Sequence, residues 1–242
     1  MNCTESNWYE YKCLHFDFQG REAILVCPKE NCVGIKWLLK TEYFGAFPNF
    51  ELEMLKRGYH LAYLTNITRW HDEADDDAKK AFCEFLHHEF ALHEKCLPVG
   101  MSCGGMLGVY FAAKYPEHVA ALYLDAPVMN LLSCPAGVGE AGNDLYEEFY
   151  QHKRMTISEL INYRNHPIDC ADKLLEHKIP IFIVAGDSDD TVPYVENGKP
   201  FYEYYRQRGG EIFEIIKQGC GHHPHGLEDS TPLIEFTYKY YV

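Results

Sequence analysis

The stretch that decides the fold is residues 97–108, LPVGMSCGGMLG. An apolar run ends at Gly100, Ser102 follows, and a second run of small and apolar residues starts at Gly104. This pattern predicts a short buried strand, a sharp turn at Ser102 and a buried helix that ends before Pro116. Serine is common among small residues, so the meaning of Ser102 depends on the rest of the chain.

Predicted strands and helices alternate along the remaining sequence. Apolar strand patterns cover 13–18, 23–27, 59–64, 97–101, 119–124, 181–185 and 211–217. Helical patterns follow Asn49 and cover 78–90, 104–115, 201–207 and 231–240. Strands that alternate with helices predict an α/β fold with a mostly parallel central sheet flanked by helices. The length predicts one domain over residues 1–242.

Polar residues follow four of these strands. Ser102 comes after 97–101, Asp125 after 119–124, and the loop GDSDDTVP (186–193) after 181–185. The last strand leads into GCGHHPHG (219–226). The carboxyl ends of parallel strands meet at one edge of a sheet, where ligands and catalytic groups gather. The sequence therefore predicts a serine, an acid and a histidine at one site, in that order along the chain.

This order resembles the α/β-hydrolase superfamily, whose nucleophile lies in the pattern G-x-S-x-G. Residues 100–104 match that pattern, GDSDDTVP is similar to the superfamily's acid loop, and Gly221-His222 matches the usual Gly-His at the base. The string GHHPHG is similar to bacterial hydrolases of the prolyl-oligopeptidase and acetyl-esterase groups. The resemblance covers roughly residues 13–240. It implies a serine hydrolase with Ser102 as nucleophile, Asp189 as acid and His222 as base.

The chemistry explains each residue type. A serine hydroxyl needs a base within hydrogen-bond reach, and imidazole can take its proton and return it to the leaving group. The carboxylate fixes the tautomer of the imidazole and stabilises its charged form. We expect cleavage of a small or medium carboxylic ester through an acyl-enzyme. The alternatives are an exopeptidase or amidase of prolyl-oligopeptidase type, and a non-catalytic ligand receptor on the same fold.

Transition-state stabilisation requires two oxyanion donors. The first expected donor is the backbone N–H of Cys103, directly after the nucleophile. The second is expected from the loop after strand 23–27. The sequence does not choose among the candidates there, which are Gly34, Ile35, Lys36 and Trp37.

Other residues compete for the acid and base roles. Asp125 remains an alternative to Asp189, whereas Asp187 and Asp190 are typical of turn residues that bond to local backbone. His223 and His225 are alternatives to His222, which is favoured because it directly follows Gly221. The thiol of Cys103 is a further candidate nucleophile, but the turn directs position 102 into the site and position 103 away from it.

The three histidines also suggest a metal site, with Glu228 and Asp229 as conceivable carboxylate ligands. A metal leaves the serine and aspartate loops unexplained. The sequence therefore predicts no metal and no cofactor.

Residues 129–170 lie at the usual insertion point for a lid in the superfamily. They lack a strand pattern and predict a short helical cap. The aromatic residues expected to bind substrate are Tyr146, Phe149 and Tyr150, with packing of the cap onto the core as the alternative.

Composition limits the remaining classes. The net charge of −14 argues against nucleic acid or an anionic membrane as a partner, because both require clustered Lys and Arg. The ten cysteines include no CxxC pair, and the N-terminus shows no signal-peptide pattern. We expect a reduced, cytoplasmic protein that acts on a small-molecule ester as a monomer or homodimer.

Overall fold

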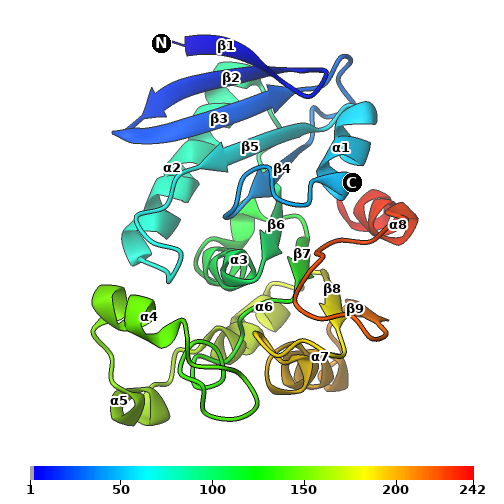
Figure 1. Cartoon of the computed structure of the whole chain (residues 1–242). Coiled ribbons are helices and arrows are strands. Elements are labelled where there is room, and N and C mark those ends of the chain that lie inside the picture. Colours follow the sequence, from blue (N-terminus) through cyan, green and yellow to red (C-terminus); the bar gives the residue numbers. More distant parts are fainter. Residues whose placement is uncertain (1–2) are drawn as a thin grey trace.

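The computed structural model describes residues 3–242, which form an α/β structure around a nine-stranded sheet (Figure 1). The strands are β1 (Cys3–Trp8), β2 (Tyr11–Phe18), β3 (Arg21–Cys27), β4 (Trp37–Lys40), β5 (His60–Leu64), β6 (Leu97–Met101), β7 (Leu122–Asp125), β8 (Ile181–Gly186) and β9 (Ile212–Lys217). The helices are α1 (Asn49–Lys56), α2 (Glu73–Phe90), α3 (Cys103–Lys114), α4 (Tyr146–Lys153), α5 (Ile157–Asn162), α6 (Ala171–Glu176), α7 (Gly198–Gln207) and α8 (Thr231–Tyr240).

The order of the strands is β1-β2-β3-β5-β4-β6-β7-β8-β9. From β5 through β4 and β6 to β9 all neighbours are parallel, whereas β1, β2, β3 and β5 pair antiparallel. The expected α/β fold with a mostly parallel sheet is confirmed. The carboxyl ends of β4, β6, β7, β8 and β9 consequently share one edge, with β6 between β4 and β7.

Helices cover both faces of the sheet. Helices α1 and α8 lie on one face and α2 and α3 on the other (Figure 1). Phe82 of α2 and Met106 of α3 are fully buried in one apolar cluster, and Met54 of α1 and Leu233 of α8 in the other. Complete burial of such a side chain contributes about 1.5–3 kcal/mol. The two-sided core therefore fixes the parallel strands in place.

Two strands were not predicted from the sequence. Residues of β1 are almost all exposed at the edge of the sheet. Strand β4 has only four residues, WLLK, and all four are buried. A short strand buried on both faces has no alternation of apolar and polar residues. Because β4 was not predicted, the expected position of the second oxyanion donor is affected, as described below.

Helix α2 begins with a capped, acidic first turn. The Asp72 side chain accepts a hydrogen bond from the Ala74 N–H (2.9 Å), and acidic residues occupy the first turn. Residues 129–170 contain α4 and α5 without a strand. All ten cysteines are free thiols. Among residues 3–242, no helix is long and apolar enough to cross a membrane.

Candidate active site

Ser102 lies on a sharp turn between β6 and α3. Its backbone has φ 53° and ψ −120°, a region that costs energy for a residue with a Cβ and is characteristic of functional sites. Gly100 permits the turn, because a Cβ there would lie 2.4 Å from the Gly104 carbonyl oxygen. The Ser102 N–H donates to the Asp125 carbonyl (2.9 Å). The turn thus presents the hydroxyl at the carboxyl edge of the sheet.

The structure brings Ser102, His222 and Asp189 together in one chain of hydrogen bonds. His222 Nδ1–H donates to Asp189 Oδ2 (2.7 Å), and its Nε2 lies 3.1 Å from Ser102 Oγ. The other carboxylate oxygen of Asp189 accepts from the N–H groups of Thr191 and Val192 at 2.9 and 2.8 Å. These backbone donors fix the orientation of the carboxylate, and the Nδ1–H bond to it leaves Nε2 of His222 facing the serine hydroxyl as an acceptor.

A second acid–histidine pair lies beside the first. His225 Nδ1–H donates to Asp125 Oδ1 (2.6 Å), and both side chains are buried. Asp125 Oδ2 accepts from the Tyr123 hydroxyl (2.9 Å) and the Gly226 N–H (2.8 Å). Asp125, the alternative acid, therefore binds a different histidine from the one that faces Ser102.

A cavity of about 310 Å³ opens over Ser102. Its lining residues are Tyr43, Ala46, Phe47, Arg69, Met101, Ser102, Leu145, Thr191, His222, His223 and His225. None of them is an acid, and Arg69 is the only one with a permanent charge. Arg69 is paired with Glu148 of α4, which accepts from its Nε (2.7 Å) and from the Trp70 indole (3.0 Å).

The thiol of Cys103 is unsuited to be the nucleophile. The side chain is 1% exposed, and burial raises its pKa to about 11. A protonated thiol is a weak nucleophile. The side chain of Cys103 is packed, as expected, and the role of its backbone N–H stays a prediction.

The structure does not bring Gly34, Ile35, Lys36 or Trp37 to Ser102. These residues precede or begin β4, whereas Ser102 follows the end of its parallel neighbour β6. Three of their N–H groups also have other partners: Ile35 donates to the Cys32 carbonyl, Lys36 to the Cys32 sulfur and Trp37 to the Tyr241 hydroxyl. The expectation that the second oxyanion donor lies within 34–37 is therefore wrong. The error arises because strand β4 was not predicted, so the loop that follows it was not considered.

The loop after β4 faces the nucleophile instead. The Thr41 hydroxyl donates to the Gly104 carbonyl in the first turn of α3 (2.7 Å). Tyr43, two residues later, has φ 56° and lines the cavity. Its hydroxyl accepts from Arg69 Nη1 (3.3 Å), and burial raises its pKa far above the usual range. The tyrosine is therefore a neutral, fixed part of the cavity wall.

The aromatic residues expected to bind substrate pack against one another and, through Phe149, against Trp70 outside the cap segment. Phe149 is fully buried against Trp70, with ring centroids 5.5 Å apart, and Tyr146 stacks on Phe149. Tyr150 packs beside Tyr146. None of the three lines the cavity over Ser102. The residue of this segment that does line it is Leu145, which directly precedes α4. These contacts match the alternative expectation, in which the aromatic residues pack the cap onto the core.

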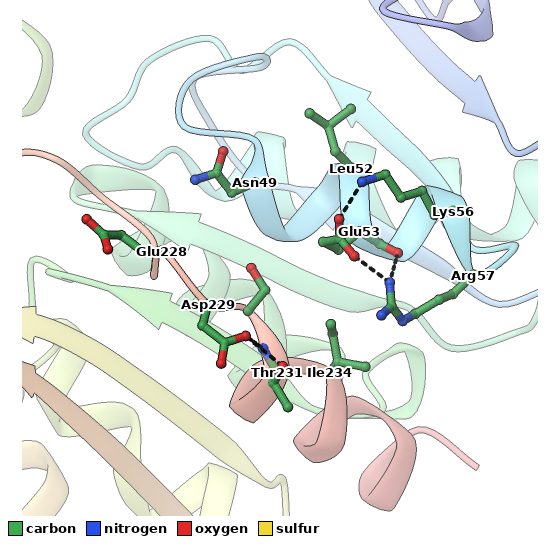
Figure 2. Close-up of a pocket in the computed structure, with 10 residues that line it drawn as sticks. Asn49, Leu52, Glu53, Lys56, Arg57, Glu228, Asp229, Thr231 and Ile234 are labelled. Atoms are coloured by element: carbon green, nitrogen blue, oxygen red, sulfur yellow. Dashed lines mark hydrogen bonds and ion pairs between the residues drawn. The ribbon is translucent and has the colours of Figure 1, made fainter.

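The possible carboxylate ligands for a metal lie elsewhere. Glu228 and Asp229 line a separate cavity of about 520 Å³ between α1 and the start of α8 (Figure 2). Figure 2 also shows Glu53 in that cavity bonded to Lys56 and Arg57, and Asp229 bonded to Thr231. That cavity holds no nucleophile paired with a base. The cavity over Ser102 is the smaller of the two and is lined by the serine and histidine that contact each other.

A comparison of the sequence with known families gives a match to the prolyl oligopeptidase family over residues 58–241. This chain belongs to the prolyl oligopeptidase family. Members of this family are serine hydrolases with the α/β-hydrolase fold, and the serine, acid and histidine loops all lie in the matched residues. No curated protein matches the chain.

Solved structures share the fold of this prolyl oligopeptidase family member. Est1E from Butyrivibrio proteoclasticus has a TM-score of 0.65 and 16% identity, over 95% of this chain and 98% of its own. A thermostable carboxyl esterase from Bacillus coagulans gives 0.62 and 13%, with both chains fully covered. The acylaminoacyl peptidase of Pyrococcus horikoshii gives 0.66 and 15%, over 98% of this chain. This chain spans only 35–41% of the length of the first peptidases matched.

Proposed function

We propose that this serine hydrolase cleaves a small or medium carboxylic ester, with Ser102 as nucleophile, His222 as base and Asp189 as the orienting acid. The observation that carries the proposal is the continuous hydrogen-bond chain from Asp189 through His222 to Ser102 Oγ. This chain joins the loops that follow β6, β8 and β9, and each of the three loops contributes a residue to the lining of one cavity.

The reaction has two steps. Ser102 Oγ adds to the ester carbonyl carbon as its proton passes to His222 Nε2. The C–O bond to the alcohol then breaks, and His222 returns the proton to the departing oxygen. In the second step a water molecule loses its proton to His222, adds to the acyl carbon and releases the acid. Asp189 stays ionised throughout and stabilises the imidazolium.

Two backbone N–H groups are assigned to the oxyanion. Cys103 begins α3, where the first N–H groups of a helix have no partner within the helix and can stabilise an anion. The second assigned donor is the Tyr43 N–H. Its present contact, to the neighbouring Glu42 carboxylate at 3.3 Å, is long, and a substrate oxyanion can replace it.

The lining of the cavity favours esters over peptides with a free amino terminus. An exopeptidase that reads an ammonium group needs an acid near the nucleophile, and the described lining contains none. Ala46, Phe47 and Leu145 supply apolar surface for an acyl or alkyl group.

Residues 129–170 are proposed to act as the cap. Leu145 lines the cavity, and Glu148 of α4 binds Arg69 on its wall. The segment therefore contributes to the choice of substrate directly and through Arg69.

The test is hydrolysis of p-nitrophenyl esters of rising acyl length beside aminoacyl p-nitroanilides, with Ser102→Ala as control. We expect turnover of short or medium esters, little turnover of the anilides, and no turnover by the variant. Preference for anilides would show the peptidase alternative to be correct. No turnover of either class by the folded wild-type protein would contradict the proposed function.

A further inference from the structure

The loop after β9 carries two histidines that the reaction above does not use. His222, His223 and His225 each place a ring nitrogen within 4.8 Å of the others. The centroids of the three rings are 4.8–5.0 Å apart. Three imidazoles this close form a set of nitrogen donors around one point.

Two of the three rings are held in the tautomer that a metal requires. Asp189 accepts from Nδ1 of His222, and Asp125 accepts from Nδ1 of His225. Each ring is thereby left with its Nε2 lone pair available. A carboxylate on the far nitrogen is the usual support of a metal-binding histidine, because it fixes the ring and raises the basicity of the coordinating nitrogen.

The third ring is accessible from solvent. His223 is exposed, stacks on Phe47 with centroids 5.4 Å apart, and makes no side-chain hydrogen bond within residues 3–242. Both ring nitrogens of His223 are therefore without a hydrogen-bond partner among the described residues.

Charge also favours a cation at this point. Two buried carboxylates, Asp125 and Asp189, back the histidines, and the one cation in the cavity lining, Arg69, is already paired with Glu148. Donors that are all imidazole nitrogens suit Zn²⁺ and its neighbours rather than Mg²⁺ or Ca²⁺. Zn–N bonds of about 2.0–2.1 Å put tetrahedral ligands about 3.3 Å apart, so the nitrogens, now within 4.8 Å of one another, must approach by up to about 1.5 Å when the metal binds.

We propose that His222, His223 and His225 form an inhibitory site for a divalent transition metal such as Zn²⁺. The metal takes the Nε2 lone pair of His222 that otherwise accepts the Ser102 proton. Metal binding and ester hydrolysis therefore exclude each other. This use of the histidines is compatible with the triad, whereas a metal in place of the triad is not. The inhibitory part rests on the proposed function, and the binding part does not.

The binding test is calorimetric titration of ZnCl₂ into the whole chain without chelators. We expect one site in the wild type and in Ser102→Ala, and an affinity at least about tenfold weaker in His223→Asn. The exposed His88→Asn on α2 is the matched control and should leave the affinity unchanged. Cys220→Ser tests the nearby thiol. Equal affinity in wild type and His223→Asn, or a loss in Cys220→Ser alone, would overturn the site.

The inhibition test measures ester hydrolysis against Zn²⁺ concentration, with each variant compared with its own metal-free rate. We expect half-inhibition near the calorimetric dissociation constant in the wild type, and at about tenfold or more higher Zn²⁺ in His223→Asn. Zinc binding with undiminished hydrolysis overturns the inhibitory role. Zinc binding by a protein that hydrolyses no ester contradicts the proposed function and leaves the metal site standing.

Discussion

Two acid–histidine pairs lie side by side at the carboxyl edge of the sheet, and only one faces the nucleophile. The distance from Nδ1 of the histidine to the carboxylate oxygen is 2.7 Å between His222 and Asp189 and 2.6 Å between His225 and Asp125. The chemistry of the two pairs is the same, and the histidines come from the same loop. The difference is the second ring nitrogen, which lies 3.1 Å from Ser102 Oγ in His222. Under the proposed function, the base is therefore distinguished by its alignment with Ser102 and not by its distance from the acid.

The supports of the two acids differ as well. Backbone N–H groups of Thr191 and Val192 hold Asp189, whereas Asp125 is held by the Tyr123 hydroxyl and one backbone N–H. The proposed catalytic acid, Asp189, is thus fixed by its own loop. The second acid is fixed partly by a side chain of its own strand, β7, and links that strand to the histidine loop. We infer that the first pair serves mainly the reaction and the second mainly the architecture of the site.

The largest expected effect is that of removing the base. His222→Ala should lower kcat for a p-nitrophenyl ester by about 10⁵-fold, because the serine loses its proton acceptor. Steady-state kinetics measure the loss. A variant that retains more than about a tenth of wild-type activity would show that His225 can replace His222, and the comparison between the pairs would fail.

Asp189→Asn should have the next largest effect, a drop in kcat of about 10⁴-fold with folding retained. The N–H groups of Thr191 and Val192 hold the amide oxygen at the Oδ1 position, so the amide NH2 faces His222 Nδ1 and favours the wrong tautomer of the ring. Thermal unfolding monitored by circular dichroism provides the check on folding. Normal activity in this variant would move the acid role to Asp125.

Asp125→Asn tests the second acid–histidine pair. We expect a kcat within about tenfold of the wild type and a loss of stability of about 1–3 kcal/mol, because a buried hydrogen bond to His225 is broken. A loss of that size lowers the melting temperature of a chain this long by roughly 2–12 °C. If kcat falls as far as in Asp189→Asn while the melting temperature is unchanged, the second pair is catalytic.

The smallest expected effect belongs to Tyr123→Phe. This change removes one hydrogen bond to Asp125 and leaves the apolar ring in place, at a cost of about 1 kcal/mol of stability. Chemical denaturation measures the difference, and kcat should remain near its wild-type value. A kcat reduced by more than about tenfold would mean that the support of the second acid reaches Ser102.

The sequence allowed one half of the site to be predicted. Ser102, Asp189 and His222 each follow a strand with a clear apolar pattern and lie in a recognisable loop, so their order and meeting point could be stated in advance. The pairing of Asp125 with His225 could not, because two acids and three histidines allow several pairings. Only the positions of β7, β8 and β9 in the sheet decide between them.

The prediction of the second oxyanion donor depended on recognising β4. Its four residues, WLLK, are buried on both faces and have no alternation, so they were included in a loop. That error displaced the expected oxyanion donor to 34–37, at the wrong end of the strand. The loop that does face Ser102, with Thr41 and Tyr43, follows β4 because β4 lies next to β6. Neighbours in a sheet that are far apart in sequence leave no local signal.

The central claim is that Ser102 is activated by the Asp189–His222 pair and not by the Asp125–His225 pair. The most direct measurement is the rate and position of labelling by a fluorophosphonate, read by mass spectrometry in wild type, Asp189→Asn and Asp125→Asn. We predict an adduct on Ser102 alone, formed at least about 100-fold more slowly in Asp189→Asn and within about tenfold of the wild-type rate in Asp125→Asn. An adduct on another residue, or equal slowing in the two variants, would contradict it.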